Sequence, residues 1–215
     1  MRLLQLLSAF LIGLAPLAAS LAAERTITGR VLDQDGKPVA QAVVFVQEPL
    51  AVKGASAPAV MDQFNKAFEP EVLPIAVGTQ VRFPNRDQIR HHVYSFSRAK
   101  RFELPLYKGE NAPPVLFDQA GVVKIGCNIH DWMSAVILVL PNQHYVVTDA
   151  EGRFTLSDLP AGAHTITAWH ARSREKTEEI GQRLDAAASN AELAFKLALA
   201  PLRRRPATRG ARWDQ

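Results

Sequence analysis

One short segment of the sequence carries three side chains that can bind a soft metal ion. Cys127, His130 and Met133 stand three residues apart, and the neighbouring His91 and His92 offer an imidazole upstream. Thiolate and thioether sulfurs favour Cu(I), whereas imidazoles bind copper in both oxidation states. Two histidines, one cysteine and a weakly bound methionine form the donor set of a type 1, or blue, copper centre. The pattern therefore predicts one copper ion at these residues.

The adjacent histidines cannot both serve such a site. If they lie on a strand, His91 and His92 point to opposite faces, so only one of the two imidazoles can reach the metal. The residues alone leave this choice open.

Each of these residues also has an ordinary structural interpretation. A lone cysteine is often a small buried hydrophobe, and a lone methionine usually packs in a core. Cys127 is the only cysteine of the chain, so it cannot form an internal disulfide. It is the combination of donors within one loop and one upstream strand that favours a metal site. The other histidines, His144, His164 and His170, are expected to be structural.

The body of the chain has the pattern of short strands. Apolar and polar residues alternate in several stretches, and turn-forming residues separate them. The alternating stretches are 81–83, 123–125 and 193–199, and the turns are at 35–38, 77–78, 151–152 and 160–162. This pattern predicts an all-β protein built from antiparallel sandwiches.

Two distant stretches look like halves of one unit. The first reads TGRVLDQDGKPV at 28–39, and the second reads TDAEGRFTL at 148–156 followed by LPAG at 159–162. Together they resemble the carboxypeptidase-regulatory-like, transthyretin-like β-sandwich. The resemblance implies that residues 24–55 and 142–200 form one sandwich into which another domain is inserted.

The inserted segment, residues 56–141, resembles the cupredoxins. The likeness rests on FEP at 68–70, GTQVRFPNRD at 78–87, HHV at 91–93 and the strand entering Cys127. The short ligand loop is most similar to the amicyanin type, the kind labelled methylamine utilization protein. The resemblance implies a Greek-key sandwich whose last strand, 136–140, follows the ligand loop.

The same resemblance implies that His91, Cys127, His130 and Met133 bind a single type 1 copper, with His92 as the substitute for His91. The flanking residues Asn85 and Val93 favour His91 when the segment is aligned with the family. Many cupredoxins carry an asparagine directly after the first histidine to brace the ligand loop. Here His92 stands in that place, so this bracing is not expected.

The two ends of the chain have distinct compositions. Residues 1–23 have the positive start, apolar stretch and small-residue exit of a secretory signal peptide. Residues 201–215 hold five arginines and one aspartate, which predicts a basic disordered tail. Of the formal net charge of +4, Arg2 accounts for +1 and this tail for +4, so residues 24–200 carry −1. The tail could contact an anionic surface weakly, and nothing in the sequence suggests nucleic-acid recognition.

These patterns predict an exported, soluble periplasmic protein with no transmembrane segment in its mature form. It is expected to carry single electrons between periplasmic redox proteins or dehydrogenases, and not to be an enzyme. An amine-oxidation chain is one conceivable source of electrons. The alternatives are a copper carrier or sensor without electron-transfer turnover, and a metal-free interaction module. A basic cluster at Arg90, Arg98, Lys100 and Arg101 is either a solvated face or a surface that orients an acidic redox partner.

Overall fold

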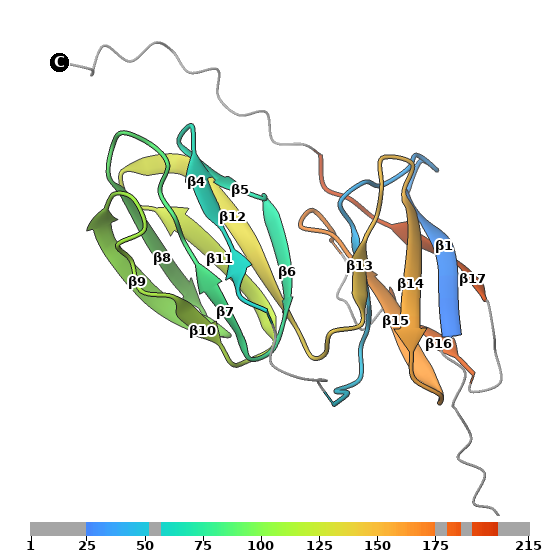
Figure 1. The fold of residues 1–215 in the computed structure, drawn as a ribbon. Helices are drawn as coiled ribbons and strands as arrows, with labels where there is room; N and C mark the ends of the chain where they lie inside the picture. Colours follow the sequence, from blue (N-terminus) through green and yellow to red (C-terminus); the bar gives the residue numbers. More distant parts are fainter. Residues whose placement is uncertain (1–24, 52–56, 175–179, 186–190, 202–215) are drawn as a thin grey trace, which may run out of the picture.

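The structure is a computed structural model that describes residues 25–51, 57–174, 180–185 and 191–201. The expected signal peptide and nearly all of the expected basic tail lie outside these residues. The elements defined among them are seventeen β-strands, which confirms the all-β fold class (Figure 1). Among the described residues, no helix has the length and apolarity needed to cross a membrane.

The strands from β3 to β12 form the first sandwich. Its larger sheet has five strands in the order β6 (Val72–Ala76), β12 (His130–Leu140), β11 (Gly121–Cys127), β8 (His91–Ser97) and β9 (Lys100–Tyr107). The facing sheet has the order β10 (Val115–Phe117), β7 (Thr79–Arg82) and β3 (Ala59–Val60). A short hairpin of β4 (Asp62–Phe64) and β5 (Ala67–Glu69) completes it.

Alternation along the strands fills the core between these two sheets. Val123, Ile125 and Cys127 on β11 point inward and are buried, whereas Lys124 between them is exposed. Val81 of β7 and Phe117 of β10 close the core from the opposite sheet. Cys127, at the end of β11, therefore lies at the edge of a packed apolar interior.

The remaining strands form the second sandwich. One sheet has the order β14 (Arg153–Leu159), β1 (Arg25–Asp33) and β17 (Glu192–Leu197). The other has the order β13 (Tyr145–Val147), β2 (Val43–Val46), β15 (His164–Trp169) and β16 (Gln182–Leu184). The chain leaves this sandwich after β2 and re-enters it at β13.

Glycine is needed where β14 and β17 flank β1. Gly29 lies on β1 and pairs with residues of both neighbours. A Cβ there would collide with the Leu193 carbonyl oxygen and lie 2.7 Å from the Phe154 ring. The glycine that the sequence places in the TGRV segment thus allows close strand packing.

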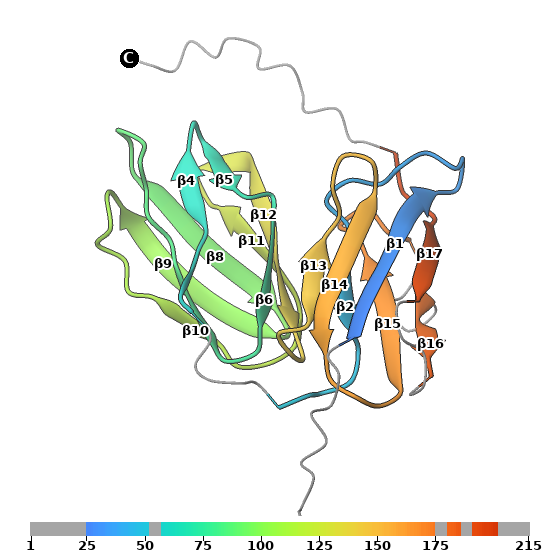
Figure 2. The same ribbon diagram turned by 45° about the vertical axis from the view of Figure 1, so that its right-hand side comes forward.

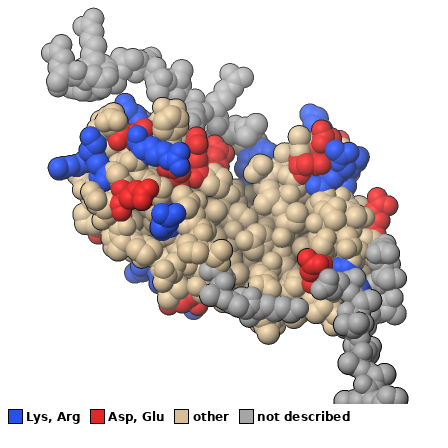
Figure 3. Space-filling view, in the orientation of Figure 1, with Lys and Arg blue, Asp and Glu red and all other residues tan. Residues whose placement is uncertain are grey.

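The two sandwiches meet along an apolar junction (Figure 2). Leu138 and Leu140 of β12 pack in one buried cluster with Val43, Phe45 and Trp169 of the second sandwich. Strand β12 therefore carries candidate metal ligands near its start and the junction near its end. Figure 3 shows charged side chains of both signs gathered at the upper ends of both lobes, with mostly uncharged surface between them.

Candidate metal centre

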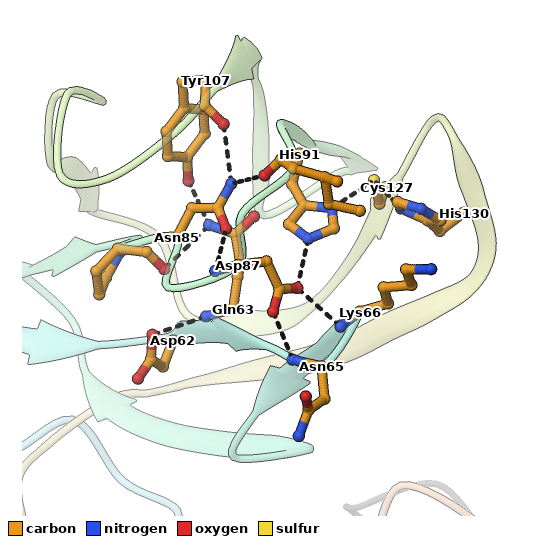
Figure 4. A network of polar contacts seen from close by, with 12 residues as sticks. Asp62, Gln63, Asn65, Lys66, Asn85, Asp87, His91, Tyr107, Cys127 and His130 are labelled. Atoms are coloured by element: carbon orange, nitrogen blue, oxygen red, sulfur yellow. Dashed lines mark hydrogen bonds and ion pairs between the residues drawn. The ribbon is translucent and has the colours of Figure 1, made fainter. Parts of the chain in front are cut away.

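Three of the expected ligands converge at one end of the first sandwich (Figure 4). The Sγ atom of Cys127 lies 3.9 Å from Nδ1 of His91 and 3.6 Å from Nδ1 of His130. The two imidazole rings are 5.0 Å apart in an edge-to-face arrangement. All three donor atoms lie within 4.8 Å of one another. They therefore surround a single point.

A tight hairpin places Cys127 beside His130. The two residues are register partners across β11 and β12, and only two turn residues separate them. The pairing shifts between Gly126 and Cys127, and such a bulge re-aims the side chains that follow it. The expected last strand, 136–140, is thus only the second half of β12, so His130 and Met133 lie on a strand and not in the expected short ligand loop.

Strand β8 brings His91 from the other side. Its neighbour β11 pairs with it at Gly126 and Tyr94, so the first residue of β8 lies near the end of β11. His91 is completely buried. Alternation then turns the next side chain away: His92 Nε2 lies 2.9 Å from the carboxylate of Glu103, on the other face of the sheet. The structure brings His91, and not His92, to the cysteine.

Asp87 fixes the orientation of the His91 ring. Its Oδ2 lies 2.7 Å from His91 Nε2, so the ring's other nitrogen, Nδ1, faces the thiol. The same carboxylate accepts the backbone N–H groups of Asn65 and Lys66, each at 2.8 Å, in the turn between β4 and β5. Burial raises the pKa of Asp87, but the hydrogen bonds from His91, Lys66 and Asn65 outweigh it, so the net pKa is lowered from 3.8. Asp87 is therefore a carboxylate anchor for both the ring and the turn.

Asn85 holds the loop that leads to His91. Its Nδ2 donates to the carbonyl oxygens of Ile89 and Tyr107, each at 2.9 Å, and its Oδ1 accepts the N–H of Asp87. The buried Gln63 amide in turn donates to the Tyr107 hydroxyl at 2.5 Å. Burial raises the pKa of Tyr107 to about 12, despite the hydrogen bond with Gln63. The loop that leads to His91 is thus held by the side-chain amide of Asn85.

Electrostatics keep the second imidazole in its ligand form. Burial lowers the pKa of His130, and the neighbouring His91 and Lys66 lower it further against the opposing charge of Asp87. A neutral imidazole offers the lone pair that a metal requires. Met133 is 1 % exposed and lies on β12 three residues after His130.

These residues fit a copper ion. Metal bonds to thiolate and imidazole of about 2.0–2.3 Å allow a sulfur–nitrogen separation of up to about 4.3 Å. The separations of 3.6 and 3.9 Å lie within that limit. The N and S donors are also of the types that copper selects over hard cations.

Comparisons with known proteins find similar chains among solved structures. No protein-family model and no curated protein matches the chain. Among solved structures, an oxidised amicyanin variant is 24% identical over 46% of this chain and 98% of its own, with a TM-score of 0.35. A purple cupredoxin from Nitrosopumilus maritimus is 26% identical over 37% of this chain and 95% of its own, with a TM-score of 0.33. A copper-containing nitrite reductase from Thermus scotoductus SA-01 is 26% identical over 43% of this chain, with a TM-score of 0.37, and this chain spans 25% of it.

The structural neighbours are cupredoxins and a copper enzyme. These three matches are partial, and each extends over less than half of this chain. The expected transthyretin-like sandwich, the methylamine-utilization label and the domain boundaries stay predictions.

Sequence reasoning missed the residues that brace the ligands. In the sequence, Asp87 and Asn85 stand out only as part of the family-like segment at 78–87, and no pattern marks Gln63. A signal existed, because a carboxylate four residues before a candidate ligand histidine can reach back to its ring across a turn. Gln63 is far in sequence from the loop that leads to His91, so the sequence holds no comparable signal for it.

Proposed function

We propose that this chain is an exported type 1 copper protein that carries single electrons between periplasmic redox partners. The observation that supports this most is the convergence of the buried Cys127 sulfur with the imidazoles of His91 and His130. When bound, copper supplies a one-electron couple between Cu(I) and Cu(II). In this proposal Met133 is the weak fourth donor on β12.

The protein's contribution is to hold its donors still. Electron transfer is fast when the ligands move little between oxidation states, and Asp87, Asn85 and the β11–β12 hairpin restrain them. Burial of Cys127, which is 3 % exposed, excludes water from the sulfur. No proton transfer or nucleophile is required, so the site needs no catalytic base.

The electron's exit is proposed at the edge of His130. Its ring lies 5.2 Å from the Trp132 ring. Trp132 and Ile129 are 46 % and 50 % exposed, so apolar side chains flank the histidine at the surface. Such a patch can exclude water when a partner docks.

A copper carrier with the same ligands is the alternative, and a kinetic comparison separates the two. Copper-loaded protein is expected to show a reversible one-electron wave in voltammetry and rapid self-exchange, seen as line broadening in mixtures of oxidised and reduced protein. Transfer of the ion to a strong Cu(I) chelator is expected to be slow, because the braced site must open first. Fast release of copper without a reversible wave would favour the carrier.

The domain division belongs to the same proposal. Residues 56–141 would form the copper domain, and residues 24–55 and 142–200 the sandwich that carries it. The junction at Leu138 and Trp169 supports a fixed placement of the two.

A further inference from the structure

The five-stranded sheet has an outer face of which only one part is covered. Val136 and Leu138 of β12 pack against the second sandwich. The neighbouring strands β11 and β8 continue the same face, but there Lys124 and Phe96 are exposed to solvent. Phe96 is 76 % exposed, more than any other large hydrophobic residue that the structure describes.

An aromatic strip runs along this open face toward the metal centre. The rings of Tyr94 and Phe96 are 5.2 Å apart. Tyr94 also lies over Gly126, where a Cβ would come within 3.1 Å of its ring and hydroxyl. Because Gly126 directly precedes Cys127, the strip approaches the cysteine through the backbone of β11. Both donors Cys127 and Met133 border the shallow groove that Tyr94, Phe96 and Lys124 also line.

Cations surround the exposed ring. Arg101 is the register partner of Phe96 on β9, the N–H of Lys124 bonds to Ser97 Oγ beside Phe96, and Arg98 follows in the β8–β9 turn. None of these three cations makes an ion pair with a residue that the structure describes, and all are exposed.

Three acidic groups lie around this strip, and one of them is paired with a lysine. The Glu103 carboxylate lies 2.9 Å from His92, and that of Asp118 lies 3.0 Å from Lys100. Asp131 borders the opposite, ligand end of the groove. A hydrogen bond to His92 does not by itself cancel the charge of Glu103, but the three cations Lys124, Arg98 and Arg101 outnumber Glu103 and Asp131. The surroundings of Phe96 therefore carry a net positive charge.

We propose that Tyr94, Phe96, Lys124, Arg98 and Arg101 form a docking surface for an acidic protein. An exposed aromatic centre with a basic rim suits a partner whose own apolar patch is rimmed by Asp and Glu, because the opposite charges steer the encounter and the ring is buried on contact. That this partner exchanges electrons rests on the proposed function. The surface lies on the outer sheet face, distinct from the His130 edge.

The test uses the full chain, labelled with ¹⁵N and titrated with a random copolymer of L-glutamate and L-tyrosine, which carries both acidic and aromatic side chains, before and after addition of Cu(I). Amide shifts are expected to concentrate at residues 94–101 and 124. The double variant Lys124→Glu/Arg101→Glu is expected to weaken binding about tenfold. Phe96→Ala should weaken it without changing its dependence on salt, because it removes no charge.

Two controls keep the result specific. Lys37→Glu/Lys196→Glu makes the same charge change at exposed positions of the second sandwich and should bind as the parent does. Poly-L-lysine should cause no shifts at residues 94–101. Four outcomes would each overturn the proposal. They are amide shifts spread over all basic residues, equal weakening of binding by the control variant, tighter binding of polyuridylate, and self-association of the chain through Phe96. Binding at this surface by a protein that shows no reversible copper couple would refute the electron-carrier function alone.

Discussion

Asp87 and Cys127 lie against opposite nitrogens of the same imidazole. His91 Nε2 is 2.7 Å from Asp87 Oδ2, and His91 Nδ1 is 3.9 Å from Cys127 Sγ. With the Nε2 proton donated to the carboxylate, the Nδ1 lone pair is free to face the thiol. The carboxylate thus selects the ring form that can bind a metal.

Replacing Asp87 is expected to weaken copper binding. Asp87→Ala removes the anchor of the His91 ring and of the β4–β5 turn, and outer partners of this kind change metal affinity by about 10- to 100-fold. Competition with a Cu(I) chelator measures the loss. Asp62→Ala is the matched control, because Asp62 lies on β4 and pairs with Arg86 without touching a candidate ligand. Equal affinity in the Asp87 and Asp62 variants would contradict the role given to Asp87.

Replacing Met133 tests the proposed fourth donor. Met133→Leu keeps the buried volume, so the fold and the blue colour should persist. The reduction potential is expected to rise, because the more highly charged Cu(II) loses more than Cu(I) does when a fourth donor is removed, even though a thioether is a soft donor. Voltammetry of the copper-loaded variant measures the shift, and an unchanged potential would remove Met133 from the ligand set.

The junction between the sandwiches is expected to stabilise both. Leu138 is 4 % exposed and packs in the cluster that contains Trp169, so Leu138→Ala should cost about 2–5 kcal/mol of unfolding free energy. Leu116→Ala serves as the control, because Leu116 is 44 % exposed and its truncation should cost little. Chemical unfolding followed by tryptophan fluorescence measures both. A similar small cost for the two variants would mean that the sandwiches do not stabilise one another.

His170 is expected to make stability depend on pH. Burial, with a smaller effect from Arg172, lowers the pKa of His170 from 6.5 to about 4. Between these values the unfolded chain takes up a proton that the folded one does not, so stability falls as the pH drops from about 6.5 toward 4 and is unaffected above that window. With the ring half-buried, the loss is on the order of 1–2 kcal/mol. His170→Gln should flatten this part of the profile of unfolding free energy against pH, and an unchanged slope would exclude His170 as its source.

Local patterns allowed the fold class and the candidate ligands to be predicted. Strand alternation depends on adjacent residues, and the spacing of Cys127, His130 and Met133 spans a single hairpin. The start of β12 could not be predicted, because Asp131 and Trp132 are both exposed and break the alternation that marks a strand. The long apolar run at the end of β12 is explained by burial on both of its faces, against the core and against the junction.

The arrangement of strands in the sheet changes the membership of the expected basic cluster, which the sequence alone could not show. The four basic residues from Arg90 to Arg101 looked like one cluster, but β8 separates Arg90 from the others by its seven residues, about 23 Å of extended chain. Lys100 also forms an ion pair with Asp118. Lys124 joins the remaining arginines only because β11 lies beside β8 in the sheet.

The visible absorption spectrum on addition of Cu(II) tests the copper site most directly. A thiolate held with two imidazoles should give an intense blue or purple charge-transfer band that saturates at one ion per chain. Cys127→Ser should abolish the band, whereas His92→Gln, which alters the neighbouring imidazole on the opposite face, should retain it. A colourless complex in the parent protein, or a band that survives the loss of Cys127, would contradict the type 1 copper site.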